Sequence, residues 1–259
     1  MIAGLVLVLI SSLPGLLQAS PPPRYLVKPT CTNFTCGNFT IPYPFGMGEA
    51  CYANSWYSIN CNHSKPFLNH TGLNLEVLNI SLDYQTVTVN SPISSLCKDT
   101  EEAMTETKAS IDLNQSPFLF SRLDNIFMVL GCGSARLMDK SNEAMALASC
   151  EAICESGSTT IPHANNYFRN NYSVNLTTES KETGCVTHAL MSRCYKMGYA
   201  PLALAWTIEE NDGYASSRCN RSLHYELDRG TYSRDPCTCG SKTEGNPHLK
   251  NGCQGTLLS

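Results

Sequence analysis

The stretch Thr40-Ile41-Pro42-Tyr43-Pro44-Phe45-Gly46 sets the character of the first third of the chain. Its two prolines at alternate positions remove two backbone donors and fix an extended path, so the stretch is an edge or a loop and not a helix or a central strand. Around it, from Cys31 to Cys97, cysteines, prolines, aromatic residues and glycosylation sequons are dense. This segment is therefore predicted to form a small, cysteine-rich module that is mostly β.

Alternating apolar residues predict strands further along the chain. Residues 80–84 and 87–89 alternate around a short Asp83-Tyr84-Gln85 link, which indicates a hairpin with one buried face. Leu202, Leu204 and Trp206 also share a period of two. Strands are accordingly predicted at 118–120, 126–130 and 199–208. By contrast, residues 142–153 are good helix formers and predict one short helix.

The amino terminus has the shape of a signal peptide. Its apolar run is interrupted by Ser11, Ser12 and Pro14, so it is shorter than the roughly 20 residues that cross a bilayer, and Ala19 and Ser20 suit signal peptidase. An uncleaved signal anchor is the alternative. No later stretch approaches transmembrane length, so we expect an exported, extracellular chain without a membrane span.

The remaining residues are enough for two modules on the usual prior of about 100–200 residues per domain. The pattern Cys237-x-Cys239, a glycine-rich turn and Cys253 resembles the second half of an EGF-like module. The expected fold class is mainly β and disulfide-rich, with two small extracellular modules, the second ending in a partial EGF-like segment. The expected division is 1–20 signal peptide, 28–98 cysteine-rich β module, 99–116 polar linker, 117–235 second cysteine-containing module and 236–259 partial EGF-like tail.

All fourteen cysteines follow the predicted signal peptide. An even number of cysteines in an exported chain indicates a disulfide framework, whose pairing the sequence leaves open. Zinc is the alternative, suggested by the spacing of Cys150 and Cys154, but an oxidising compartment disfavours it and we expect no metal. The cysteines are Cys31, Cys36, Cys51, Cys61, Cys97, Cys132, Cys150, Cys154, Cys185, Cys194, Cys219, Cys237, Cys239 and Cys253.

Nine Asn-x-Ser/Thr sequons predict a heavily N-glycosylated protein. Charged residues make up only 15% of the sequence, below the about 25% typical of soluble domains, so attached glycans would help to hydrate the surface. The predicted acceptors are Asn33, Asn38, Asn62, Asn69, Asn79, Asn114, Asn171, Asn175 and Asn220.

The chain carries no recognisable catalytic motif. Its six histidines show no His-Glu-x-x-His spacing, and there is no Gly-x-Ser-x-Gly elbow or phosphate-binding glycine loop, so no enzyme activity and no cofactor are expected. The Gly131-Cys132-Gly133-Ser134 turn is better explained by a half-cystine than by a catalytic cysteine. A carboxylate pair for glycan hydrolysis stays open, because such a pair is spatial rather than sequential. A net charge of −4 argues against a nucleic-acid partner.

Several motifs together resemble the galacturonan-binding domain of plant wall-associated receptor kinases and their wall-associated-kinase-like relatives. Cys36-Gly37-Asn38 leads into the proline-rich stretch 41–46, and Cys51-Tyr52, Trp56-Tyr57 and Cys61-Asn62 follow. Later elements come in the order seen in those ectodomains, so the resemblance covers nearly the whole mature chain. They are 77–82, 129–133, Cys150 to Cys154, Gly184-Cys185 and 245–253.

The resemblance implies an extracellular module of the plant cell wall that binds pectin or oligogalacturonides and is not catalytic in this chain. After Cys253 the acidic start of a calcium-binding EGF module is replaced by 254–259, and no membrane helix or kinase motif follows, so signalling across a membrane by this chain alone is not expected. One alternative is a soluble decoy or protein partner of receptor ectodomains. Another is a secreted glycan hydrolase.

Two groups of residues are candidates for contact with a glycan. Sugar rings pack on flat apolar faces, which suggests Tyr43, Phe45, Tyr52, Trp56 and Tyr57, although burial in a small core is the competing role for such aromatic residues. A polyanionic pectin also calls for cations, but the stretch from Cys31 to Cys97 contains Lys65 alone. We therefore expect acidic-glycan affinity to depend more on Arg218, Arg221, Arg229 and Arg234, unless these arginines merely solvate a loop.

Overall fold

The computed structural model describes most of the chain in segments. They are residues 26–69, 74–98, 104–108, 111–113, 116–121, 124–130, 133–139, 142–152, 172–178, 184–191, 199–208, 223–225, 232–234 and 238–255. The predicted signal peptide over 1–20 lies outside these residues. The structural statements below concern the described residues.

The described elements are strands, apart from one 3-10 helix, η1 (Ser55–Tyr57). A six-stranded sheet has the order β3 (Ile59–Asn62), β4 (Lys65–Leu68), β5 (Leu75–Ser81), β6 (Thr86–Pro92), β15 (Tyr199–Trp206) and β9 (Phe118–Phe120). A four-stranded sheet has the order β10 (Ile126–Leu130), β14 (Gly184–Met191), β7 (Ser94–Lys98) and β8 (Met104–Thr107). A three-stranded sheet has the order β12 (Asn142–Ala152), β11 (Gly133–Asp139) and β13 (Tyr172–Thr178).

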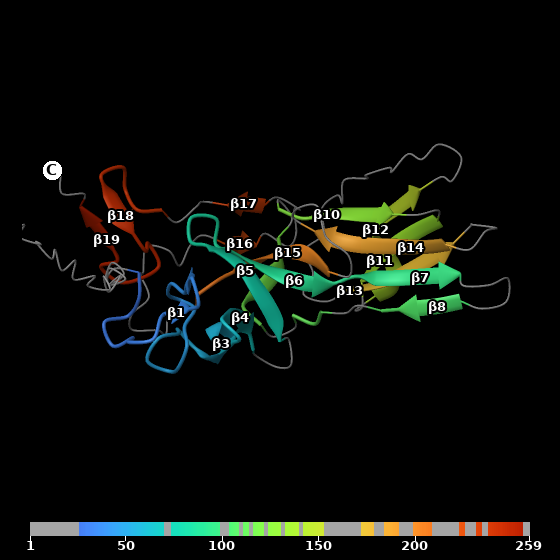
Figure 1. The fold of residues 1–259 in the computed structure, drawn as a ribbon. Helices are drawn as coiled ribbons and strands as arrows, with labels where there is room; N and C mark the ends of the chain where they lie inside the picture. The colour runs from blue at the N-terminus through green and yellow to red at the C-terminus, as the bar shows by residue number, and fades with distance from the viewer. Residues whose placement is uncertain are drawn as a thin grey trace, which may run out of the picture.

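Three short hairpins complete the fold. They are β1 (Thr35–Cys36) with β2 (Phe39–Thr40), β16 (Leu223–Tyr225) with β17 (Tyr232–Arg234), and β18 (Thr243–Gly245) with β19 (Cys253–Gly255). The molecule is elongated, with the β18–β19 hairpin and β1 toward one end, the six-stranded sheet in the middle, and β7, β8, β10 and β14 toward the other end (Figure 1). The mainly β, disulfide-containing fold class is confirmed.

The predicted hairpin and the predicted strands at 118–120, 126–130 and 199–208 are confirmed as β5–β6, β9, β10 and β15. Along β6, Val87 and Val89 are fully buried while Thr88 and Asn90, which follow them in turn, are half-buried, as a period of two requires. In β15 the successive residues 202–206 are all buried, and the strand is paired on both edges, with β6 and with β9. A register shift between Val77 and Asn79 turns Asn79 outward.

The sheets combine strands from both predicted modules. Strands β9 and β15, from the range 117–235, extend the sheet that β3 to β6 begin. Conversely, β7 belongs to the range 28–98 but lies in the four-stranded sheet, where it pairs with β14 along Ser94 to Lys98. Only Ile93 separates β6 from β7, so the chain passes directly from one sheet to the next, as Figure 1 shows. The boundary at residue 98 therefore does not coincide with a boundary between sheets.

Two segments differ from the sequence expectation. The predicted short helix over 142–153 is wrong, because Asn142–Ala152 forms β12 and pairs with β11; tertiary pairing overrides the helix propensity of its alanines and methionine. The polar stretch predicted as a linker contains β8, which pairs with β7. Residues 105–107 of β8 are all exposed at the edge of the sheet, so this strand needs no apolar alternation.

An aromatic cluster lies at the centre of the core. The Phe45 ring contacts Tyr57 edge-on at 5.3 Å between ring centroids, Trp206 edge-on at 5.8 Å, and Phe118 in a stacked arrangement at 6.2 Å. All four rings are essentially without solvent exposure. They come from the proline-rich stretch, η1, β9 and β15, so this cluster holds together segments that are far apart in the sequence.

Disulfides reinforce the short strands at the amino-terminal side. Cys31 bonds Cys51, and Cys36 bonds Cys61, which ties β1 to β3. In the tail, Cys239 bonds Cys253 and closes the β18–β19 hairpin. Closing such loops stabilises a fold mainly by restricting the unfolded chain.

One further disulfide is predicted by the strand register. Cys97 is disulfide-bonded, and Cys185 lies directly opposite it where β7 pairs with β14. Opposed residues of antiparallel strands have Cα atoms about 4.5–5.5 Å apart, within the about 4.4–6.8 Å that a disulfide spans. Peptide mapping of the unreduced, deglycosylated protein should recover a linked Cys97–Cys185 peptide, with Cys31–Cys51 and Cys36–Cys61 as internal controls. A Cys97 peptide linked to another cysteine would contradict this pairing.

Candidate functional site

The aromatic residues of the first module divide into buried and accessible ones. Tyr43 and Tyr57 are fully buried, and the Tyr57 hydroxyl donates a hydrogen bond to the Thr207 backbone oxygen. Trp56 is half-buried and packs against the core. Of the five predicted sugar-contacting aromatic residues, Tyr43, Phe45 and Tyr57 therefore offer no ring surface to a glycan in this structure. Tyr52 and Trp56 are half-buried and reach the surface.

The segment 47–58, which we call the aromatic loop, presents Trp56 together with half-buried Tyr52. The side-chain oxygen of Asn54 accepts a hydrogen bond from the Trp56 backbone N–H at 3.0 Å and so caps η1. The loop is held at its base, because Ala53 N donates to Pro44 O at 2.9 Å. At Gly46 an added Cβ would lie 2.5 Å from backbone and side-chain carbons of Cys51, so the two segments touch in a way that only glycine allows.

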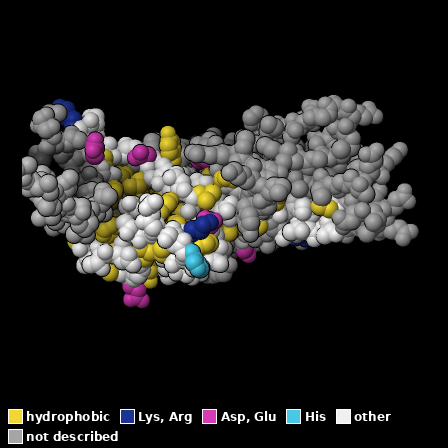
Figure 2. All heavy atoms as spheres, viewed as in Figure 1, with side chains coloured by type: hydrophobic (Ala, Val, Ile, Leu, Met, Phe, Trp, Pro, Cys, Tyr) yellow, Lys and Arg dark blue, Asp and Glu magenta, His cyan; other side chains and the backbone are white. Residues whose placement is uncertain are grey.

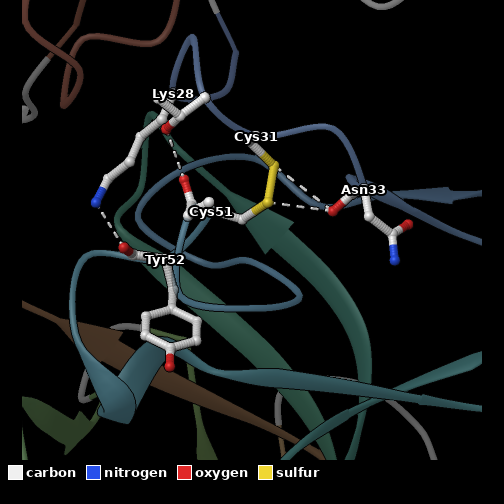
Figure 3. The surroundings of a disulfide bond; sticks show 7 residues. Lys28, Cys31, Asn33, Cys51 and Tyr52 are labelled. Atoms are coloured by element: carbon white, nitrogen blue, oxygen red, sulfur yellow. Dashed lines mark hydrogen bonds between the residues drawn. A yellow bond between two sulfur atoms is a disulfide. The ribbon is translucent and has the colours of Figure 1, made fainter.

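Two of the three lysines in the range 28–98 already have a partner. The Lys28 side chain is buried; its Nζ donates to the Tyr52 backbone oxygen at 2.7 Å and lies 5.4 Å from the centroid of the Tyr43 ring. Figure 3 shows this ammonium group at the Tyr52 backbone oxygen, with the Tyr52 ring pointing away from it. Lys65 pairs with Glu76 at 2.8 Å. Neither lysine is a ready partner for an anionic ligand.

The predicted arginine group lies mostly outside the described residues. Arg218, Arg221 and Arg229 are not among them, and Arg234 ends β17, opposite Leu223 of β16. In the described part of the face seen in Figure 2, Lys and Arg side chains are scattered and form no continuous basic patch. The first module therefore shows no cationic surface on that face.

The predicted glycosylation sites of the first module all reach solvent. Asn33, Asn38, Asn62, Asn69 and Asn79 are exposed. Asn175 lies on β13, whereas Asn114, Asn171 and Asn220 fall outside the described residues. No sequon occurs between Asn38 and Asn62, so the aromatic loop carries none.

His248 is a titratable group that the sequence did not single out. It is completely buried, its Nε2 lies 2.9 Å from the Leu82 backbone oxygen, and its ring lies edge-on to Trp206 at 4.6 Å. Since a carbonyl oxygen only accepts, Nε2 carries the proton and Nδ1 is left without a partner among the described residues. Burial lowers the pKa of His248 to about 4, against the opposing effects of the Leu82 carbonyl and the Asp83 charge.

The surroundings of His248 do not resemble a catalytic site. The ring has no solvent exposure, and no hydrogen-bond partner for Nδ1 is found among the described residues. Within the described segments, no three His, Cys, Asp or Glu side chains gather as a metal site would require. The described helix content is a single 3-10 turn, and accordingly no helix there is long and apolar enough to cross a membrane.

Comparison with known proteins finds a domain family that is similar to the first part of the chain. Residues 31–91, which include the proline-rich stretch, the aromatic loop and strands β1 to β5, match the family model described as wall-associated receptor kinase galacturonan-binding. No solved structure matches the chain significantly. The first part of the molecule is thus similar to domains of the galacturonan-binding class.

The similarity then extends beyond that domain. Wall-associated receptor kinase-like 6 of Arabidopsis thaliana is 28% identical over 86% of this chain and 44% of its own length. Wall-associated receptor kinase-like 3 of the same plant is 28% identical over 91% of this chain and 40% of its own length. Wall-associated receptor kinase-like 1 is 34% identical over 49% of this chain and 19% of its own length.

The resemblance to wall-associated receptor kinase-like proteins is therefore confirmed and covers most of the chain. The chain spans less than half the length of these relatives.

The buried His248 predicts a specific acid sensitivity. Its pKa is about 4 when folded and about 6.5 when unfolded, so the unfolded chain binds the extra proton between these values and stability falls as the pH drops through that window. At about 1.4 kcal/mol per pKa unit, the loss of unfolding free energy is roughly 3 kcal/mol. Denaturant unfolding between pH 7 and pH 4 should show it.

A pair of variants separates this effect from the titration of carboxyl groups. His248→Gln should flatten the pH dependence relative to the unchanged protein, whereas His63→Gln, at an exposed position in the β3–β4 turn, should leave it as it was. Equal slopes for the unchanged protein and His248→Gln would contradict the assignment.

Proposed function

We propose that this chain is an extracellular module that binds pectin or oligogalacturonides and performs no catalysis itself. The observation that carries the proposal is the match of residues 31–91 to the galacturonan-binding family model. The similarity to wall-associated receptor kinase-like proteins over most of the chain supports a place in the cell wall. Three described disulfides and five exposed sequons fit an exported protein.

We place the sugar-stacking part of the site on the aromatic loop. Trp56 and Tyr52 each present part of a ring, and exposed Asn54 and Ser55 lie between them as hydrogen-bonding neighbours. The loop carries no sequon, whereas glycans attached at Asn38 and Asn62 would occupy the surfaces on either side of it in the sequence. A polysaccharide therefore meets less obstruction at this loop than at the sequon-bearing turns.

We assign the charge-recognising part to the arginine group 218–234. Galacturonan is a polyanion, and cations attract it over a distance set by the ionic strength. Lys28 is buried and Lys65 is paired with Glu76, so two of the three lysines in the range 28–98 already have a partner. Arg218, Arg221, Arg229 and Arg234 provide four guanidinium groups within seventeen residues.

The aromatic loop is tested by Trp56→Ala. Removing a central tryptophan from a binding surface typically costs about 1–2 kcal/mol, so affinity for oligogalacturonide should fall about tenfold in calorimetry or a pull-down with pectin. Tyr84→Ala is the matched control, because Tyr84 is an exposed aromatic residue on the β5–β6 turn. Equal affinities for the two variants would remove Trp56 from the site.

The arginine group is tested by replacing all four residues with alanine. We expect weaker binding to oligogalacturonide and a smaller decrease of affinity with added salt, since fewer charges are then screened. Lys242→Ala with Lys250→Ala removes two exposed tail cations and should change binding little. Unchanged binding by the fourfold variant would overturn this part of the proposal.

Binding and activity assays on one preparation, the deglycosylated mature protein, distinguish the binding module from two alternatives. A soluble decoy or protein partner would bind receptor ectodomains and not pectin. A hydrolase would release reducing ends from polygalacturonate. Pectin binding by the deglycosylated mature protein, with and without calcium and without product formation, supports the binding module over both.

A further inference from the structure

We propose that the loop Gly245–Gly252, which we call the docking loop, is recognised by a surface that the amino-terminal segment, the proline-rich stretch, the β5–β6 turn and β15 form together, and that it joins the carboxyl-terminal tail rigidly to this surface. The recognising surface consists of Leu26, Tyr43, Leu82 and Trp206. The inference goes beyond glycan binding and does not depend on it. It rests on two buried polar side chains of the docking loop and their partners.

Asn246 provides the first anchor. Its side chain is completely buried, and its Nδ2 donates to the Tyr43 backbone oxygen at 2.6 Å and to the Leu26 backbone oxygen at 3.1 Å. Its Oδ1 accepts a hydrogen bond from the His248 N–H at 3.0 Å. Every hydrogen-bonding atom of this amide is thus used, and two of its three bonds cross to residues more than two hundred positions earlier.

His248 provides the second anchor. Its Nε2–H donates to Leu82 O in the β5–β6 turn, and its ring packs edge-on against Trp206 of β15. Because Trp206 also contacts Phe45, the docking loop touches the aromatic cluster that holds the core together. Leu249 is buried beside it, so the loop buries apolar as well as polar groups.

The docking loop is also held by interactions within the tail itself. Leu249 N donates to Asn246 O, and Gly252 N donates to Leu249 O, which form two consecutive turns. An added Cβ at Gly252 would lie 2.1 Å from Asn246 O, so only glycine fits there. The Cys239–Cys253 disulfide closes the base of the loop. A preorganised loop loses less conformational entropy when it docks.

This arrangement differs from that of an independent module on a linker. Interfaces between independent domains are usually polar and partly solvated, and relative motion is the default. Here Asn246 and His248 have no solvent exposure and reach the amino-terminal segment, the proline-rich stretch, a hairpin turn and β15. The chain at Cys253 therefore leaves from a fixed position on the galacturonan-binding module, and a change in that module's packing is transmitted to the tail.

The test uses the full chain, which has two tryptophans, Trp56 and Trp206. The background substitution Trp56→Phe removes the first, so that the fluorescence reports on Trp206 alone. In this background Asn246→Ala should increase amide hydrogen exchange at least tenfold in 244–252 and also in 40–46, and acrylamide should quench Trp206 several-fold more strongly. Ser241→Ala, at an exposed position of the same tail, is the control and should change neither signal.

The outcomes are separable. Unchanged exchange and quenching in Asn246→Ala, or loosening confined to 244–252, would overturn the proposal, because the loop would then be lying on the module without being held by it. Should Asn246→Ala fail to fold, His248→Phe keeps a ring against Trp206 and removes only the bond to Leu82. It should loosen 244–252 together with 80–86, and an exchange pattern like that of Ser241→Ala would again contradict the docking.

Discussion

The packing of Phe45 against Tyr57, Phe118 and Trp206 is the interaction on which the rest of the structure depends. Aromatic side chains bury about 150–250 Å² each, so four such rings supply a large part of the apolar burial of a small module. The proline-rich stretch cannot join a sheet as a central strand. It stays in place because Phe45 is inserted into this cluster.

The cluster also explains how surface and core are divided. It withdraws Tyr57 from solvent, and Tyr43 is likewise buried, with the Lys28 ammonium over its ring, so neither of these predicted sugar-contacting residues reaches the surface. The surface of the first module carries the aromatic loop and the exposed sequons.

The tail closes the same core from the opposite end of the sequence. His248 lies on Trp206 and Asn246 on the backbone of Tyr43, so the amino- and carboxyl-terminal parts of the chain share one buried centre. Burial keeps His248 neutral, because a charged imidazole there would have lost its hydration without gaining an acceptor for Nδ1. Protonation of His248 at low pH is therefore expected to weaken the attachment of the tail.

Local pattern was enough for part of this structure. The alternation in 80–89 and 202–206 determined β6 and β15, the cysteine count indicated disulfides, and the spacing of sequons predicted acceptors that lie exposed in the first module. Each of these signals is contained in a few neighbouring residues. The family motifs around Cys36 to Phe45 likewise identified the class of domain from short stretches.

Only the tertiary structure decided which segments meet. Residues 142–152 have helical propensity but become β12 because β11 offers them a pairing edge, and β15 joins β6 across more than a hundred residues. The engagement of Lys28 with Tyr52 and of Asn246 with Leu26 is invisible in the sequence for the same reason. Periodicity and propensity are properties of one segment, whereas pairing, burial and charge neutralisation are properties of two segments brought together by the core.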